Sequence, residues 1–227
     1  MLEYGMNYMW STPVRAGNLL KEGVVGERLH SWLEKYADHP RFISGPVSRA
    51  RYFARHDDSV FARPAHPELA RIKGILIARA DQYVRETVAN PLPEHDKHAT
   101  FFFVIQHPNN FAEALLPHYH EGSDVGLVYY LSTPSNGSGA LAIFDPRGLI
   151  SRGGRAFQKQ MPGFDYSPRR GDLLILPRYV LHYTNVNTDA NDRKVIAGVV
   201  KYDLPRRKAT RFLVGVKGAK VPKSASK

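Results

Sequence analysis

The second half of the chain consists of short β-rich runs separated by turn residues, and this pattern limits the fold more than any other feature. Strand-sized runs of β-branched and aromatic residues are typical of a β-sandwich or barrel. We expect strands at residues 100–106, 125–131, 140–144, 173–176 and 195–202. Because no glycine-rich loop joins a strand to a helix, the sequence disfavours a nucleotide-binding α/β fold.

Two amphipathic patterns precede these runs. Within residues 26–36 the apolar side chains fall at i, i+3, i+4 and i+7, and a similar stripe extends from Pro67 to residue 89. This spacing predicts two helices that pack on a core through one face. A chain of 227 residues suits one domain.

We therefore expect three segments along the chain. Residues 1–98 form a lead-in of helices and strand that packs on the barrel, residues 99–204 form the barrel, and residues 205–227 form a basic tail.

The absence of cysteine excludes disulfides, thiolate zinc sites and iron-sulfur clusters. Any metal must therefore be held by His, Asp or Glu. The sequence also contains no apolar run long enough to span a bilayer, and its start lacks the features of a secretory signal. These features predict a cytoplasmic protein without a membrane partner.

The net charge of +11 is concentrated at the C-terminus. Residues 205–227 hold eight Lys or Arg and no acidic residue, so the rest of the chain carries only +11 − 8 = +3. A solvated tail is the simplest interpretation. A tail that binds nucleic acid or another polyanion is the alternative, which the sequence does not favour.

Three histidines form the first candidate site. His118 and His120 are two residues apart, so in extended chain they point to the same side while Tyr119 points away. His182 follows a compact apolar run about sixty residues later. A jelly roll brings such distant strand ends together, which predicts a metal site made by the three histidines.

A basic residue follows the histidines. Arg193 opens the last expected strand, eleven residues after His182. Its guanidinium can bind one carboxylate of a diacid in a bidentate way while the other end of the diacid chelates the metal. 2-Oxoglutarate is such a diacid.

Residues 100–203 resemble the 2-oxoglutarate, Fe(II)-dependent oxygenase superfamily, specifically its small bacterial and phage branch. The similar segments, in order, are PHYHEGSDVGLVYYL, GALAIFDPRG, RRGDLLILPRYVLHYTNVN and Asp192-Arg193. The opening MWSTPV also resembles the start of that branch. The resemblance implies a mainly β, double-stranded β-helix (a cupin-like jelly roll). It also implies Fe(II), 2-oxoglutarate and O2, with release of succinate and CO2 and hydroxylation of an unactivated C–H bond.

The resemblance also implies roles for single residues. His118 would be the first iron ligand, His182 the distal ligand and Arg193 the anchor of 2-oxoglutarate. Tyr130 would be a second contact to this co-substrate, since in an extended strand it shares a face with Gly126 while Tyr129 does not. An aromatic core residue is the alternative for Tyr130.

The middle ligand departs from the usual pattern of the superfamily, which has Asp or Glu two residues after the first histidine. This chain has His120 there, as the small branch also tends to have, and Glu121 or Asp124 could supply a carboxylate instead. A site of three imidazoles would also accept zinc or nickel.

Other functions and partners stay open. A three-histidine metallo-cupin would act without 2-oxoglutarate, and Arg193 would then be structural. The substrate could be a small molecule or a peptide or protein side chain, and the long stretch 148–170 could recognise it. The sequence is compatible with a homodimer but does not argue for one.

Overall fold

The computed structural model describes residues 4–9, 12–38, 60–87, 97–108, 117–144 and 163–202. The basic tail at 205–227 lies outside them. So do residues 145–162, the greater part of the stretch from which we expect substrate recognition.

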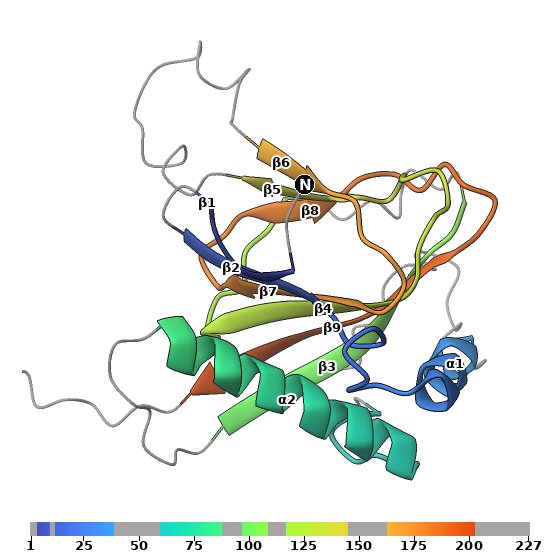
Figure 1. Cartoon of the computed structure of the whole chain (residues 1–227), viewed down its shortest axis with the longest axis horizontal. Helices are drawn as coiled ribbons and strands as arrows, with labels where there is room; N and C mark the ends of the chain where they lie inside the picture. The colour runs from blue at the N-terminus through green and yellow to red at the C-terminus, as the bar shows by residue number, and fades with distance from the viewer. Residues whose placement is uncertain are drawn as a thin grey trace, which may run out of the picture.

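Two antiparallel sheets face each other (Figure 1). In the described residues the larger sheet has six strands in the order β1-β2-β7-β4-β9-β3, and the smaller has three in the order β6-β5-β8. The strands of the larger sheet are β1 (Gly5–Met9), β2 (Thr12–Asn18), β3 (Lys97–Gln106), β4 (Val125–Ser132), β7 (Asp172–Pro177) and β9 (Arg193–Tyr202). Those of the smaller sheet are β5 (Leu141–Phe144), β6 (Gly163–Tyr166) and β8 (His182–Thr184).

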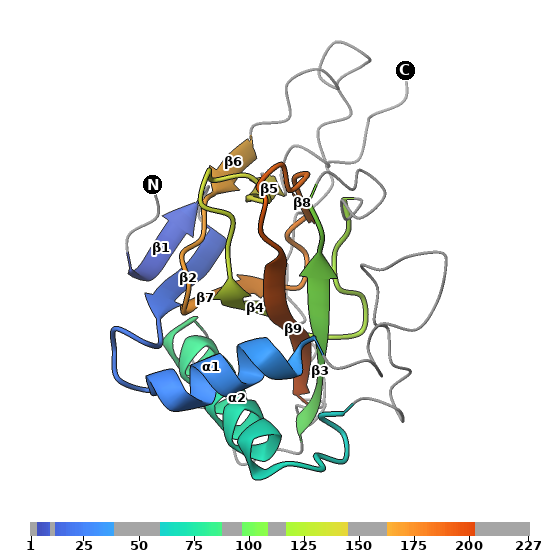
Figure 2. The same cartoon turned by 90° about the vertical axis from the view of Figure 1, so that its right-hand side faces the viewer.

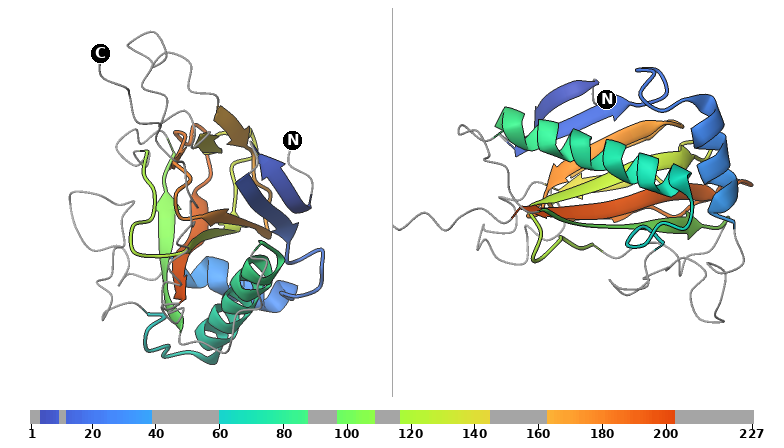
Figure 3. Two further views of the ribbon diagram at one scale, coloured as in Figure 1. Left: turned by 90° about the vertical axis from the view of Figure 1, so that its left-hand side faces the viewer. Right: turned by 90° about the horizontal axis from the view of Figure 1, so that it is seen from below.

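Helices α1 (Glu27–Tyr36) and α2 (Pro67–Thr87) cover the face of the larger sheet that points away from the smaller one (Figures 2 and 3). Alternate side chains of β3, β4, β7 and β9 pack against the apolar stripes of the helices, as the two-residue period of a strand requires. We call this cluster the outer core. Its buried members include Leu33, Leu76, Phe103, Leu127 and Ile175.

The other set of alternate side chains points into the space between the two sheets. This inner core includes Val104, Leu141, Leu174 and Val195, and it also contains the ring of Tyr130. Tyr129, one residue earlier on β4, belongs to the outer core. The prediction that Tyr130 enters the barrel and Tyr129 does not is therefore confirmed.

The sequence located both helices and five strands with small shifts at their ends, and it missed four strands. Residues 163–166, expected to be part of a long loop, form β6 and pair with β5. β1 and β2 pair with each other, and β2 extends the larger sheet beside β7. β8 has only three residues. Neither described helix is long and apolar enough to cross a membrane.

Candidate metal centre

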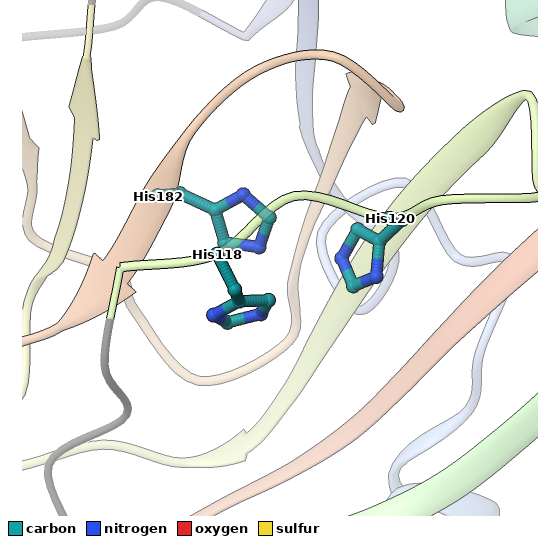
Figure 4. Close-up of side chains that lie close together, drawn as sticks. All are labelled: His118, His120 and His182. Atoms are coloured by element: carbon teal, nitrogen blue, oxygen red, sulfur yellow. The ribbon is translucent and has the colours of Figure 1, made fainter.

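His118, His120 and His182 converge in space although sixty residues separate the first two from the third (Figure 4). One ring nitrogen from each lies within 4.8 Å of those of the other two. The ring centroids of His118 and His182 are 4.5 Å apart, and that of His120 lies 5.3 Å and 5.0 Å from them. Among the described residues, these three histidines form the one cluster of His, Asp or Glu side chains whose ligand atoms are close enough together to hold a metal ion.

Backbone hydrogen bonds hold the three histidines together. His118 and His182 form an antiparallel bridge in which each amide donates to the other's carbonyl at 3.0 Å. The amide of His120 donates to the carbonyl of Arg178 at 3.1 Å, in the turn between β7 and β8. Tyr119 points outward and is 51% exposed, as the two-residue period predicts.

The ring of His182 is oriented for ligation. Its Nδ1 lies 2.9 Å from the carbonyl oxygen of Val180, so Nδ1 carries the proton and donates it. Nε2 is then the atom with a free lone pair. A carbonyl partner of this kind is typical of metal-binding histidines, because it fixes both the tautomer and the ring plane.

Burial keeps two of the rings neutral. Loss of hydration, followed by the charge of His118, lowers the pKa of His120 to about 4. Burial and then the charge of His118 lower the pKa of His182 to about 3, against the favourable hydrogen bond to Val180. The neutral imidazole is the form that binds a metal, so these rings need lose no proton near pH 7.

Gly126 makes room for His120. A Cβ added at Gly126 would lie 2.7 Å from Cδ2 and 3.1 Å from Nε2 of His120, so a side chain there would displace the ring. Gly126 lies on the inward face of β4, four residues before Tyr130 on the same face. The absence of a side chain at Gly126 thus leaves room for the ring of His120 next to β4.

The two carboxylates considered as substitutes for His120 are not part of this group. Glu121 is exposed and accepts a hydrogen bond from the hydroxyl of Tyr119 at 2.7 Å. Asp124 accepts one from the amide of Tyr202 at 2.8 Å. The described geometry therefore favours His120 as the third ligand.

Arg193 lies in the interior, at the start of β9, and is only 2% exposed. Its guanidinium carbon lies 5.2 Å from the centroid of the Tyr130 ring. No carboxylate in the described part of the chain forms an ion pair with it. A buried cation without a counter-charge is costly, which is the condition that an acidic ligand would relieve.

Unpaired polar atoms accompany this cation. Of the buried side-chain atoms that the structure describes, four have no hydrogen-bond partner: Arg193 Nε, Tyr130 OH, Gln106 Oε1 and Thr184 Oγ1. Native proteins leave few such atoms, and each calls for an explanation. All four come from strands that line the space between the sheets, where a polar ligand would satisfy them.

Gln106 and Thr184 are not among the site residues that we predict from the sequence. Thr184 follows His182 by two residues, so the period of a strand places both on the same inward face. Gln106 continues the inward series of Phe102 and Val104 on β3. The alternation of side chains could thus have identified both residues once His182 and Val104 were placed.

The two facing sheets define a double-stranded β-helix, so the predicted fold class is confirmed. Three of its histidines form a group that could hold a metal ion. Residues 101–198 match the family described as "Putative 2OG-Fe(II) oxygenase". The cofactors of these oxygenases are Fe(II), 2-oxoglutarate and O2, as we predict from the sequence. No curated protein sequence matches the chain.

Solved structures with the same fold include several enzymes. AviO1 from Streptomyces viridochromogenes Tue57 is 13% identical with a TM-score of 0.59, over 86% of this chain and 92% of that one. A prolyl-4-hydroxylase from Pseudomonas putida is 12% identical with a TM-score of 0.54, over 85% and 94%. The non-heme alpha ketoglutarate dependent epimerase SnoN is 13% identical with a TM-score of 0.57, over 92% and 86%.

Proposed function

We propose that this chain is an Fe(II)- and 2-oxoglutarate-dependent hydroxylase in which His118, His120 and His182 bind the iron. In the same proposal Arg193 and Tyr130 bind the far carboxylate of 2-oxoglutarate. The convergence of the three histidines supports the first part. The family of residues 101–198 supports the choice of iron over zinc or nickel.

The observation that carries the proposal is the buried guanidinium of Arg193, which has no carboxylate partner among the described residues. A bidentate carboxylate would neutralise it and supply strong, charge-assisted hydrogen bonds. The hydroxyl of Tyr130, also buried and unpaired, can donate to the same carboxylate. An organic diacid that binds the metal through its other end fits both groups.

Strand β8 connects the two ends of this site. Thr184 lies one side-chain repeat, about 6.6 Å, from His182 on the inward face. Asn185, the next residue, accepts a hydrogen bond from the side chain of Gln106, which is paired in register with Arg193. The strand thus leads from the metal ligands to the neighbourhood of the guanidinium, within one interior.

Bound iron would supply the activation of O2 that is coupled to decarboxylation of 2-oxoglutarate to succinate and CO2. The chain's own residues orient the co-substrate and exclude water. The inner core, with Leu174, Leu176 and Val180 fully buried, provides a dry wall for the reaction. We expect the product to have gained one oxygen atom at a carbon that previously carried hydrogen.

The substrate belongs to the proposal as well. We propose that the substrate is a small molecule or a peptide or protein side chain, and that the protein is cytoplasmic. The neighbours of the same fold include a prolyl-4-hydroxylase and an epimerase, so this scaffold serves more than one oxidative outcome. Hydroxylation is our choice because His120 fills the ligand position that a halogenase would leave to a small residue.

The test is an anaerobic titration of the Fe(II)-loaded protein with 2-oxoglutarate, followed through the visible metal-to-ligand charge-transfer band. We expect a band in the wild type and a much higher 2-oxoglutarate requirement in Arg193→Ala. Arg15→Ala, on the helix-covered side of the sheet, is the matched control and should leave the titration unchanged. Iron binding without a band at any concentration would contradict the proposal and favour a metallo-cupin that does not use 2-oxoglutarate.

A further inference from the structure

Gln106 ends strand β3 on its inward face and is 1% exposed. Its Nε2 donates to the carbonyl of Asn185 at 2.8 Å, and its own carbonyl accepts from Nδ2 of Asn187 at 3.1 Å. The first bond orients the side-chain amide of Gln106, and the second, to its backbone carbonyl, anchors the end of the strand. They leave Oε1, the acceptor end of the amide, buried without a partner.

Arg193 is the residue paired with Gln106 across the β3–β9 ladder. Its Nε–H, a donor, is likewise buried and unpaired. The two side chains approach each other beside Gly139, where an added Cβ would lie 3.0 Å from Arg193 Cδ and 3.4 Å from Gln106 Oε1. Gly139 has φ +64°, a conformation that glycine adopts without strain. Because glycine has no side chain, the backbone can lie close to both Arg193 and Gln106.

We propose that Gln106 positions Arg193 and thereby makes the pocket specific for a dicarboxylic 2-oxo acid. When a carboxylate is bound, Gln106 Oε1 accepts the hydrogen bond from Arg193 Nε. The inference rests on the proposed function, since it assumes that Arg193 binds the far carboxylate of 2-oxoglutarate.

The geometry of the guanidinium explains the positioning. It offers two edges to a carboxylate, one that includes Nε and one between the two terminal nitrogens. A bond from Nε to Gln106 occupies the first edge and directs the second toward the ligand. In the complex this bond holds the fork in the orientation in which both terminal nitrogens face the bound carboxylate.

The neutrality of the glutamine explains the specificity. No described carboxylate pairs with Arg193, so the interior beside Gln106 keeps one positive charge, which a ligand carboxylate would neutralise. A glutamate at position 106 would have nearly the same shape but would pair with the guanidinium itself. A ligand carboxylate would then be repelled, whereas a 2-oxo acid without that group would not.

The experiment compares two ligands on the full-length, Fe(II)-loaded protein under anaerobic conditions. Both 2-oxoglutarate and 2-oxopentanoate carry the chelating 2-oxo acid, and only the former has the far carboxylate, so the charge-transfer band gives a Kd for each. In the wild type we expect 2-oxoglutarate to bind about 100-fold more tightly. In Gln106→Glu we expect its Kd to rise about 100-fold while that of 2-oxopentanoate changes less than about threefold.

Two further variants separate positioning from a general structural role. Gln106→Met keeps the volume and removes the amide, so both the acceptor Oε1 and the bond from Nε2 to the carbonyl of Asn185 are lost. We expect the Kd of 2-oxoglutarate to rise about tenfold and that of 2-oxopentanoate to stay unchanged. Gln82→Glu makes the same chemical change on α2, across the larger sheet from the pocket, and should change neither Kd. The ratio of the two values is internal to each variant, so a loss of stability does not mimic the result.

The possible failures are distinct. If Arg193→Ala abolishes the preference for 2-oxoglutarate and both Gln106 variants keep it, the inference about Gln106 is wrong and the proposed function stands. If the wild-type protein gives no band with either 2-oxo acid, the proposed function and this inference are both wrong.

Discussion

Tyr129 and Tyr130 are adjacent on β4, yet they lie on opposite faces of the larger sheet and differ in their hydrogen bonding. The hydroxyl of Tyr129 lies 2.7 Å from Nδ1 of His30 on α1, whose Nε2 lies 2.9 Å from the carbonyl of Leu131. The hydroxyl of Tyr130 is just as buried and has no hydrogen-bond partner among the residues that the structure describes. Among the described residues, the buried polar atoms without a hydrogen-bond partner thus lie on strands that line the inner face, whereas Tyr129 on the outer face is paired.

The largest expected effect comes from removing the buried cation of the inner face. In Arg193→Leu we expect 2-oxoglutarate to bind about 100-fold more weakly, because two charge-assisted hydrogen bonds are lost. The metal-free, ligand-free protein should be as stable as the wild type or more stable, since an unpaired buried charge is gone. Urea unfolding and the charge-transfer titration measure the two quantities.

Arg15→Leu is the control on the outer face, where Arg15 forms an ion pair with Glu86. It should leave 2-oxoglutarate binding unchanged. If Arg193→Leu is instead the less stable protein by more than about 2 kcal/mol, then Arg193 serves the fold and the contrast between the faces fails.

A smaller effect is expected where the inward face of β4 contacts His120, one of the three proposed metal ligands. Gly126→Ala places a methyl group 2.7 Å from His120 Cδ2, so the ring must move. We expect metal affinity to fall about tenfold, as for other changes next to metal ligands. Gly74→Ala is the control, because nothing lies within 4 Å of a Cβ added there, and isothermal titration with Fe(II) or Zn(II) checks both. Equal affinities would show that His120 is not a ligand.

The two tyrosines allow the comparison to be tested at a single atom each. Tyr129→Phe leaves His30 Nδ1 without its donor, and we expect it to lower the free energy of unfolding by about 1–2 kcal/mol. Tyr130→Phe breaks no bond in the ligand-free protein and should change that value by less than about 0.5 kcal/mol. It should nevertheless weaken the binding of 2-oxoglutarate, because a donor to its far carboxylate is lost. Equal losses of stability would contradict the division between the faces.

The smallest effect concerns the pH dependence of stability on the outer face. Burial lowers the pKa of His30, while the hydrogen bond to Leu131 opposes the shift. The unfolded chain then binds a proton near pH 6.5 that the folded chain resists, so the contribution of His30 is present above that pH and lost as the pH falls. Between pH 7 and 5.5 we expect the wild type to lose up to about 1 kcal/mol more than His30→Gln. Parallel pH profiles of urea unfolding would contradict this assignment.

Local patterns were sufficient for much of the fold. The spacing of apolar residues located both helices, and apolar runs located the strands that carry Tyr130 and Arg193. β2 and β6 were missed because Pro13, Gly17 and Gly163 weaken their strand character. Their pairing with β7 and β5 compensates for this only in the folded chain.

The site was predictable to the extent that its residues share a short-range period. His118 and His120 are two residues apart, and His182 follows an apolar run, so their types and places were informative. The role of His30 could not be read locally, because its partner Tyr129 lies 99 residues away. Gln106 likewise gains its meaning only from its cross-strand neighbour, 87 positions later in the sequence.

The backbone bridge between His118 and His182 has an entropic consequence. Joining two points about sixty residues apart in a flexible chain costs roughly 4 kcal/mol of closure entropy, by the logarithmic dependence on loop length. Folding of the two sheets has already met this cost before any ion arrives, so metal affinity reflects only small adjustments of three rings. An ion that binds the folded chain and not the unfolded chain therefore stabilises the fold. It does so by opposing the separation of the start of β8 from the segment before β4.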